Sequence, residues 1–532
     1  MTDREPGGSD RLWAGLVAAA TALLTLPVLR LGFVHDDRSL IEHSPRVGDL
    51  ATLPRALVSD LFWLSDSVRP SPYWRPWVTF TYYLDHLVGG GGPGVYHLHN
   101  GLLAVVLALV VWWAAGKRWQ GAVVAGLVVL HPSFVEPVAN ITARTDLYVA
   151  LLGTAAVVLP RRWGLVALGL ALGCKETAIL VPALWALQGL GRGWRSAWAE
   201  SRWGWLVVGV WLVVRSLLVG GRSAGAPWEG WGGIPGRLGM ALQRMVAPSG
   251  GPRPDVDLAG VPDVGMWVGG LLVVVVAGAF VALAWRRRDQ VAVALAMVLG
   301  PLLLTSGLAG PGIRMADGLL AWPLVGVGLV LARLPGRGLG FLVPVVAVLA
   351  WGHSQRLAVW SSPETLWHAA LVERPDDPRV QLKLGRVVLE GAPRKALLLA
   401  GPVQAHADAR LRREGHELAA RALLLEREPG EDDLLREHLR AAAVADDREA
   451  GWAYGALCVW DDQHPGRVAV CETAIALGGA TGDVWNTLGI AVAGQGDMGA
   501  ARDAFAAAVA LEPGRQEFKD NLARAEVLMG GG

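Results

Sequence analysis

The sequence predicts an all-α protein in two parts, a polytopic bundle of membrane helices followed by a soluble solenoid of helical repeats. The 532 residues are 53% hydrophobic and only 18% charged, whereas soluble domains usually carry about 25% charged residues. Gly (68) and Trp (25) are both abundant, and they favour membrane helices and membrane interfaces respectively. Apolar runs fill the chain up to about Trp351, and beyond Ser361 it becomes rich in Arg, Glu, Asp and Ala.

Eleven apolar runs are candidate spanning helices, since a helix needs roughly 20 apolar residues to cross the hydrocarbon core. The third to the sixth run are short and separated by tight turns. No A-x-A-like cleavage site follows the first run, so we interpret it as an uncleaved anchor. The runs occupy residues 12–33, 97–116, 120–135, 145–160, 162–174, 177–190, 203–220, 264–285, 290–308, 316–333 and 337–353.

The change in composition places a domain boundary near residues 352–362, which gives a membrane domain at 1–355 and a repeat domain at 356–532. Two long segments interrupt the membrane domain, at 34–96 and 221–263. The first contains amphipathic stretches such as 53–58, which we expect to lie along the membrane surface.

The distribution of basic residues predicts the orientation, because cytoplasmic loops are enriched in Lys and Arg. With the N-terminus in the cytoplasm, every inside segment is basic, and eleven spans put both long segments and the repeat domain outside. The short outside turns hold only Arg144, Lys175 and Arg314. We therefore expect an integral protein of the bacterial inner membrane with a periplasmic repeat domain.

The last third of the chain matches tetratricopeptide (TPR) repeats, which are helix pairs of about 34 residues. Residues 482–515 fit the template without gaps, with Trp485, Leu488, Gly489 and Phe505 at the expected spacing. A degenerate unit is expected around Leu384, and residues 400–480 are expected to hold two more. Such stacks present a groove for a protein partner, although this one could also be a structural cap.

The sequence gives no sign of nucleic-acid binding or of a cysteine-based metal site. No basic or aromatic-basic strip indicates binding of nucleic acid, and the three cysteines do not form a metal-ligand cluster. Cys458 and Cys471 fall near facing positions of one helix pair. They could form a disulfide in an oxidising compartment or remain two buried thiols.

The first candidate site residues are Asp36 and Asp37, directly after the first apolar run. A solvated juxtamembrane pair, with Asp37 capping a following helix, is the alternative. Arg75 follows two aromatic residues and could be only an interfacial anchor. His97 and Asn100 open the second span and could simply cap it.

The turn that joins the third and fourth spans is the richest in polar residues. Its two prolines explain why the helix breaks there, but they do not explain why the turn carries charged residues. It carries His131, Glu136, Asn140, Arg144 and Asp146. A local ion pair of Arg144 with Asp146 or with Glu136 is the simplest structural explanation.

Two further outside turns carry cations. Lys175 could pair with the adjacent Glu176 or bind a phosphate. Arg314 opens the tenth span, where the positive end of a helix dipole would also favour an anion. Carboxylates suit general-base chemistry, and cations suit a phosphate leaving group. These turns together therefore predict acid–base chemistry at the extracytoplasmic face of the membrane.

Several of these residues occur in one recognisable order. They are the string Phe33-Val34-His35-Asp36-Asp37, the Arg75-Pro76 step, His97-Leu98-x-Asn100, the long motif from His131-Pro132 through Glu136, Asn140 and Arg144 to Asp146-Leu147, and Lys175-Glu176-Thr177. In this order the chain resembles the transmembrane-and-TPR O-mannosyltransferases and their bacterial relatives, which are GT-C glycosyltransferases. The resemblance covers nearly the whole chain.

The resemblance implies inverting transfer of a sugar from a polyprenyl-phosphate donor within a GT-C-type membrane bundle. Asp36 would be the general base, Asp37 would orient it, and Glu136 would be a second catalytic acid. Arg144, Lys175 and Arg314 would bind the donor phosphate. The remaining candidates would shape the pocket: Arg75, His97, Asn100, His131, Asn140, Asp146 and Glu176.

The sequence also departs from the family. His35 stands where relatives often have an aromatic residue, and the tyrosines expected after Arg314 are missing. A divalent cation would suit paired acids, which can also act without one. The expected partners are a polyprenyl-phosphate sugar, an acceptor protein or glycan, and membrane lipids. A non-enzymatic, membrane-anchored TPR scaffold is the alternative, but it does not need acids and bases in five outside turns.

Overall fold

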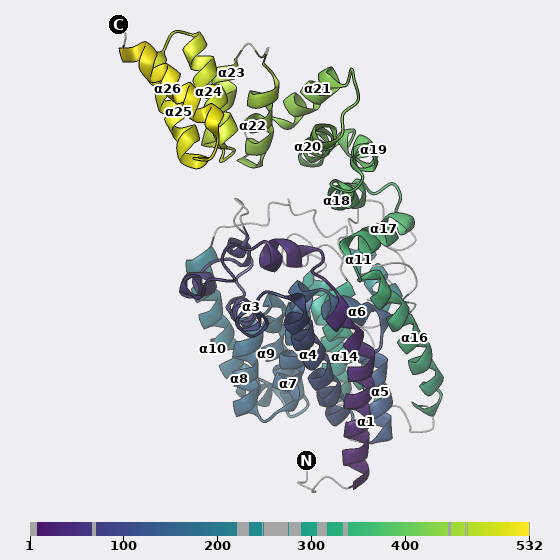
Figure 1. Ribbon diagram of the computed structural model, residues 1–532. Coiled ribbons are helices and arrows are strands. Elements are labelled where there is room, and N and C mark those ends of the chain that lie inside the picture. Colours follow the sequence, from purple (N-terminus) through teal and green to yellow (C-terminus); the bar gives the residue numbers. More distant parts are fainter. Residues whose placement is uncertain are drawn as a thin grey trace. The chain divides into compact units, whose positions relative to one another are not determined.

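The protein is all-α in every part of the chain that the structure, a computed structural model, describes (Figure 1). The described residues are 8–65, 71–116, 118–220, 234–246, 248, 275, 289–305, 317–333, 339–444, 448–462, 464 and 466–530. They contain no strand, which confirms the predicted fold class. The chain divides into two compact units, Met1–Ala369 and Ala370–Gly532.

Unit 1 is built from helices of very different lengths. The longer ones are α1 (Gly8–Thr25), α3 (Pro76–Gly89), α4 (Pro93–Ala114), α5 (Trp119–Val129), α7 (Arg144–Val158), α8 (Arg161–Leu172), α9 (Val181–Leu190), α10 (Trp194–Val219), α11 (Ile234–Val246), α13 (Asp289–Leu303), α14 (Ala321–Leu331) and α16 (Val343–Val359). The short ones are η1 (Leu26–Arg30), η2 (Arg38–Glu42), η3 (Leu50–Thr52), α2 (Leu53–Val58), η4 (Leu61–Leu64), η5 (Pro132–Phe134), α6 (Val135–Ala139), η6 (Ile141–Ala143), η7 (Glu176–Leu180) and η9 (Asp317–Leu320).

Four helices among the described residues are long and apolar enough to cross a membrane: Ser9–Arg30, Pro93–Ala114, Ile141–Val158 and Trp194–Val219. A fifth span is present if Trp119–Val129 and Pro132–Ala139, which meet at a bend of 65°, count as one. Three more apolar helices are shorter: Glu176–Leu190, Gln290–Leu303 and Asp317–Leu331. Fewer than the predicted eleven runs pass this test because turns divide several of them, and the run at 264–285 lies outside the described residues except for position 275.

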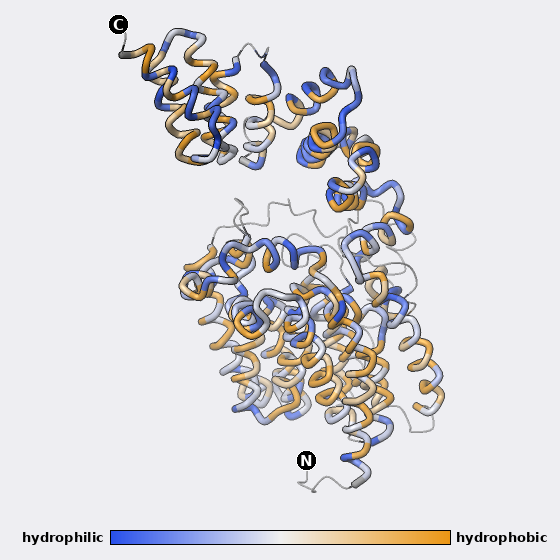
Figure 2. The backbone as a smooth tube through the Cα atoms, viewed as in Figure 1, coloured by the Kyte–Doolittle hydropathy of each residue, from blue (hydrophilic) through white to orange (hydrophobic). Residues whose placement is uncertain are grey.

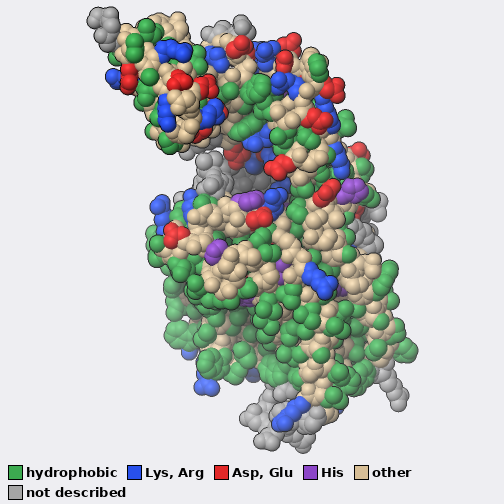
Figure 3. Space-filling view, viewed as in Figure 1, with side chains coloured by type: hydrophobic (Ala, Val, Ile, Leu, Met, Phe, Trp, Pro, Cys, Tyr) green, Lys and Arg blue, Asp and Glu red, His purple; other side chains and the backbone are tan. Residues whose placement is uncertain are grey.

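The outer faces of these helices are apolar. Leu23 and Leu217 expose 69% and 80% of their surface, and tryptophans of α10 are also exposed. Hydrophobic residues dominate the helices of unit 1 (Figure 2), and their side chains gather over the lower part of unit 1 in Figure 3. Apolar surface of this extent is stable against lipid rather than water, so unit 1 is an integral membrane domain.

The centre of unit 1 is held together by close helix approaches at glycines. Helix α4 packs against α1, α3, α5 and α7, and α14 packs against α7 and α13. A Cβ on Gly153 of α7 would lie 2.7 Å from the Trp322 ring, and one on Gly326 of α14 would lie 2.7 Å from the Ala294 carbonyl oxygen. Small residues at helix crossings are typical of membrane bundles.

Unit 2 begins within α17 (Pro363–Glu373), and the boundary predicted at residues 355 and 356 falls within α16. Its surface mixes Lys, Arg, Asp and Glu (Figure 3). The helices are α18 (Pro378–Val388), α19 (Pro393–Gln404), α20 (Ala409–Leu425), α21 (Asp432–Ala442), α22 (Gly451–Trp460), α23 (Arg467–Ala476), α24 (Gly482–Gly494), α25 (Met498–Leu511) and α26 (Gln516–Gly530). Consecutive helices pack against each other, as in a helical-repeat solenoid.

The TPR unit predicted at 482–515 corresponds to the helix pair α24 and α25. A Cβ on Gly489 would lie 2.5 Å from the Phe505 ring, so only glycine allows this crossing. In the degenerate unit, a Cβ on Gly385 of α18 would lie 2.4 Å from a side-chain carbon of Leu418 of α20, so glycine allows the close approach there as well. The glycines of the TPR template are therefore contact points between paired helices.

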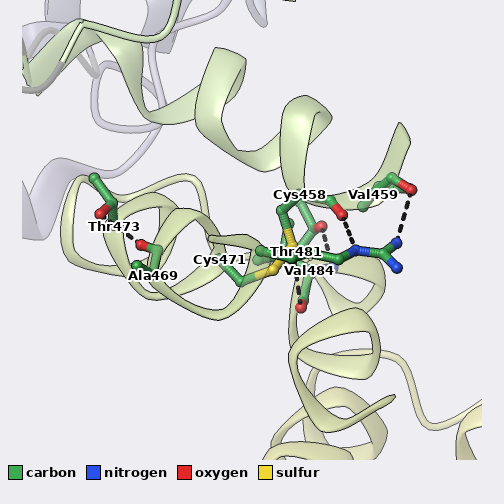
Figure 4. The surroundings of a disulfide bond; sticks show 8 residues. Cys458, Val459, Ala469, Cys471, Thr473, Thr481 and Val484 are labelled. Carbon is green, nitrogen blue, oxygen red and sulfur yellow. Dashed lines mark hydrogen bonds between the residues drawn. A yellow bond between two sulfur atoms is a disulfide. The ribbon is translucent and has the colours of Figure 1, made fainter. Parts of the chain in front are cut away.

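A disulfide joins Cys458 of α22 to Cys471 of α23 (Figure 4), which selects one of the two alternatives left by the sequence. Both cysteines are fully buried, and the backbone carbonyl of Cys458 accepts a 2.9 Å hydrogen bond from Arg467 Nε. The third cysteine, Cys174, is a buried free thiol in unit 1.

Candidate active site

The acidic pair after the first span divides into one buried and one accessible carboxylate. Asp37 is fully buried, and its oxygens accept backbone N–H bonds from Thr142 at 2.7 Å, Ile141 at 3.1 Å and Val34 at 3.4 Å. The alternative of a solvated helix cap is wrong for Asp37, which makes no capping bond to the helix it precedes. Burial raises the pKa of Asp37 to about 7, although the N–H donors oppose the rise.

Asp36 stays accessible, with 39% of its side chain exposed. Its Oδ1 lies 3.2 Å from Nδ1 of His35, whose side chain is 12% exposed. Of the two carboxylates, Asp36 is therefore the accessible one and Asp37 the buried one.

Glu136 lies on α6, just after the bend that His131 and Pro132 introduce. Its Oε2 accepts a 2.9 Å hydrogen bond from the backbone N–H of Gly318. A Cβ on Gly318 would lie 3.4 Å from Oδ2 of Asp146 and 3.7 Å from Cδ of Glu136. The Gly318 backbone thus lies close to both carboxylates, and a Cβ there would be in ordinary van der Waals contact with them.

Lys175 and Glu176 each find a partner far from themselves in the chain. Lys175 Nζ donates to Asp146 Oδ1, and both side chains are almost fully buried. Glu176 instead lies 3.4 Å from Arg75, whose guanidinium also stacks on the Tyr73 ring. The local pair of Lys175 with Glu176, one of the two alternatives left by the sequence, is not formed, and Arg75 forms an ion pair as well as contacting an aromatic ring.

Arg144 is fully buried, with donors from all three guanidinium nitrogens engaged. It donates to Asp85 Oδ2 at 2.5 Å, to Asn100 Oδ1 at 2.9 Å, and to the Tyr96 carbonyl and Thr81 hydroxyl at 3.0 Å. The local ion pairs considered from the sequence are not formed. This geometry favours a structural role for Arg144 over the expected binding of donor phosphate.

The sequence analysis missed Asp85, although a carboxylate within a mostly apolar and aromatic helix was a usable signal. Its second oxygen lies 2.8 Å from His99 Nδ1, and His99 Nε2 lies 2.7 Å from the Tyr148 hydroxyl. A chain of buried polar groups thus links α3, α4 and α7.

The remaining pocket-shaping candidates hold the backbone around these groups. Asn100 donates to the carbonyls at 137, 138 and 140, and His97 contacts the Gly32 carbonyl at 3.3 Å. His131 caps η5 by accepting from Ser133 N–H, and Asn140 accepts from the Thr142 hydroxyl. The capping alternative is wrong for His97 and Asn100, which lie within α4 and are buried.

A second buried ion pair, also missed, adjoins Gly318. Arg356 of α16 donates to Asp317 Oδ2 at 2.5 Å, and Arg244 of α11 lies 3.4 Å from Oδ1. Arg356 was assigned to the repeat domain from its sequence context, which hid its burial in unit 1. Arg314, the expected cation of this turn, lies outside the described residues.

Within the described ranges, no three His, Cys, Asp or Glu side chains lie close enough together to hold a metal ion. The structure therefore assigns no ligands to the divalent cation considered from the sequence. The acids and bases are instead arranged as pairs, each with a protein partner.

An all-α integral membrane protein with a half-exposed carboxylate beside buried acid–base pairs is the class that the fold and site define. No protein-family model matches the sequence. Among curated proteins, the chain is 35% identical over 185 residues to Protein O-mannosyl-transferase Tmtc1 of Drosophila melanogaster, which covers 31% of this chain and 21% of the relative. Tmtc2 of the same organism is 34% identical over 196 residues, covering 32% and 21% respectively.

Protein O-mannosyl-transferase TMTC1 of Homo sapiens is 31% identical over 147 residues, which cover 26% of this chain and 17% of the relative. The homologues of the chain are thus protein O-mannosyl-transferases, which confirms the resemblance drawn from its motifs. The matched segments span about a fifth of the length of these relatives.

Proposed function

We propose that this protein is a membrane glycosyltransferase of the GT-C type that moves mannose, or a similar hexose, from a polyprenyl-phosphate donor to a Ser or Thr hydroxyl of a protein. The names of the homologues support the class of reaction. The observation that carries the proposal is the convergence of separate chain segments. Residues 34–37, 136–146, 175–176 and 317–318 meet through hydrogen bonds and close contacts, and Asp36 remains accessible beside them.

Asp36 is the proposed general base. Its carboxylate takes the proton of the acceptor hydroxyl while the hydroxyl oxygen forms a bond to the anomeric carbon. The bond from that carbon to the donor phosphate breaks, and its electron pair stays on the phosphate. Attack from the face opposite the phosphate inverts the anomeric configuration. Asp37 supports this step by fixing the backbone next to Asp36.

Lys175 is the proposed partner of the donor phosphate. Its ammonium group has three N–H donors, so the bond to Asp146 leaves capacity for a phosphate oxygen. Glu136, held by the Gly318 N–H, is the proposed second acid at the sugar or the acceptor. Arg314 keeps its proposed role at the phosphate, whereas the contacts of Arg144 support the bundle instead.

The proposed location is the bacterial inner membrane, with the N-terminus in the cytoplasm and unit 2 in the periplasm. The disulfide between Cys458 and Cys471 supports this side, because disulfides persist in oxidising compartments. On that side, unit 2 can bind an acceptor protein or a partner next to a lipid-linked donor.

Transfer of radiolabelled mannose from polyprenyl-phosphate mannose, in membranes from cells that express each variant, tests the base. Asp36→Asn should reduce transfer by a factor on the order of 100 or more, since an amide cannot accept the proton. The matched control is Asp49→Asn, because Asp49 caps η3 through Ala51 N–H and asparagine caps equally well. Equal transfer by wild type and Asp36→Asn would remove Asp36 as the base.

A further inference from the structure

The end of unit 1 at which α8 and α10 begin and α9 ends has an excess of positive charge. The first turn of α8, the loop after α9 and the first turns of α10 contain five arginines and one acidic residue, Glu200. Both oxygens of Glu200 are engaged, since Oε2 accepts from Arg161 at 2.6 Å and Oε1 accepts from Arg192 at 2.9 Å. Arg195 is exposed and makes no hydrogen bond or ion pair with any residue that the structure describes.

Exposed tryptophans indicate that this end lies at a membrane interface, where tryptophan is enriched. Trp163 of α8 is 56% exposed, and Trp194 and Trp198 of α10 are 79% and 59% exposed. Helix α10 is long and apolar enough to cross a membrane, and it packs against both α8 and α9 (Figure 1). The excess positive charge therefore lies at the depth of the lipid headgroups.

A groove of about 400 Å³ opens between α9 and α10 at the same end, and pockets for small molecules usually measure about 300–1,000 Å³. Besides the tryptophans, Ser201 is the one polar side chain among the described residues that line it, and its hydroxyl already donates to the Ala197 carbonyl at 2.9 Å. The groove therefore offers mainly apolar contact. Its walls include Ala183, Ala186 and Leu190 of α9 and Trp194, Trp198 and Trp205 of α10.

Arg195 borders this groove. The residues of α10 that line it recur at helical spacing and form one stripe, and Arg195 lies about 60° beyond Trp198 on the helix surface, because an α-helix turns by about 100° per residue. Arg202 follows Arg195 by two turns and is also exposed, with its guanidinium over the Trp203 ring at 5.5 Å. A basic stripe thus runs beside the apolar one.

We propose that this groove binds an anionic phospholipid, with one acyl chain between α9 and α10 and the phosphate at Arg195. A guanidinium binds phosphate oxygens through two parallel N–H bonds, and Arg195 has no acidic partner among the described residues. An acyl chain has no polar group to satisfy, which suits a groove whose hydroxyl is already bonded. The proposal does not depend on the proposed transfer of a sugar.

The position of the groove separates its occupant from a lipid-linked sugar donor. Lys175, the proposed partner of the donor phosphate, precedes η7 and α9, whereas the groove extends to Leu190 at the C-terminal end of α9. At about 1.5 Å per residue, the helical segment between them is roughly 20 Å long. One phosphate cannot contact both Lys175 and Arg195, so the groove and the candidate active site are two sites.

Titration of the purified full-length protein in detergent with single lipids, followed by native mass spectrometry, tests the headgroup contact. Wild type should bind palmitoyl-oleoyl phosphatidylglycerol about 10-fold more tightly than phosphatidylcholine with the same chains. Arg195→Gln should weaken the binding of phosphatidylglycerol by about 3- to 10-fold and leave that of phosphatidylcholine unchanged. The matched control is Arg118→Gln, because Arg118 is also exposed and directly precedes a helix, α5, but does not line the groove.

Filling the groove tests the acyl-chain contact. Ala186→Phe should weaken the binding of both lipids by about 10-fold, because its ring occupies the space of the chain. Val210→Phe is the control, since Val210 is 57% exposed on the same helix α10 and does not line the groove. If Ala186→Phe does not fold, Trp194→Ala replaces it, because Trp194 is exposed and its removal leaves the interior unchanged. The same loss for both lipids is expected.

Four outcomes would overturn the proposal. The first is equal affinity of wild type for the two lipids, and the second is unchanged binding of phosphatidylglycerol in Arg195→Gln. The third is unchanged lipid binding in both Ala186→Phe and Trp194→Ala. The fourth is a different occupant, shown either by a polyprenyl phosphate that binds more tightly than phosphatidylglycerol and is lost in the same variants, or by a dimer that Ala186→Phe dissociates.

Discussion

Replacing Asp85 with Asn should destabilise unit 1 strongly, because it removes the charge that faces Arg144. The side chains of Arg144 and Asp85 are 0% and 5% exposed, and 2.5 Å separates their bonded atoms. Breaking a buried pair by removing one partner costs about 3–5 kcal/mol, since the other charge remains without compensation. At roughly 2 °C per kcal/mol, the melting temperature should fall by about 6–10 °C.

The buried free thiol of Cys174 provides the assay. The other two cysteines are bonded to each other, so a thiol-reactive fluorescent dye added to purified protein in detergent reports exposure of Cys174. Membrane proteins often unfold irreversibly, so the variants must be compared at one heating rate.

The control is Glu42→Gln, which removes the charge of an exposed pair with Arg38 at 3.0 Å. An exposed pair of this spacing contributes only about 0.3–0.5 kcal/mol, so the melting temperature should hardly change. A shift for Asp85→Asn no larger than that of Glu42→Gln would refute the reasoning. Arg144 would then not depend on Asp85, and its expected role at the donor phosphate would regain support.

Three further predictions concern other parts of the chain. Gly489→Ala should destabilise unit 2 by about 1–3 kcal/mol through a clash with the facing ring, measured as faster proteolysis, whereas Gly494→Ala in the same helix has open space and should not destabilise it. Burial raises the pKa of Asp37 from 3.8 to about 7, so its contribution to stability is complete below about pH 4 and is lost as the pH rises to about 7. The melting temperature of wild type should therefore fall relative to that of Asp37→Asn between about pH 4 and pH 7, and parallel curves in that window would contradict this sign. Denatured protein from the membrane should take up one maleimide-polyethylene glycol group before reduction and three after it, and three before reduction would show that Cys458 and Cys471 are not bonded in the cell.

The sequence predicted the helical class and the two-part organisation well, because apolar runs and the TPR spacing are local signals. It predicted the number of spans less well. The run at 120–135 reads as one apolar segment, yet His131 and Pro132 end one helix and start another at 65°. A hydropathy window measures apolarity and is insensitive to such a change of direction.

The candidate site was predicted better in its members than in its pairings. Glu136, Asp146 and Lys175 do lie together, as their shared membrane face suggested. Sequence proximity, however, suggested as alternatives a pair of Lys175 with Glu176 and a pair of Arg144 with Asp146 or Glu136. The structure pairs these residues across helices, because side chains on neighbouring helix ends can meet where adjacent residues point in different directions.

The backbone N–H groups that bind Asp37 and Glu136 are synthesised much later than the carboxylates themselves. The donors to Asp37 at Ile141 and Thr142 follow it by 104 and 105 residues, and the donor to Glu136 follows that residue by 182. A chain still emerging from the ribosome therefore contains the acidic pair long before these backbone groups exist. The hydrogen bonds around Asp37 and Glu136 therefore cannot all form until residue 318 has been synthesised.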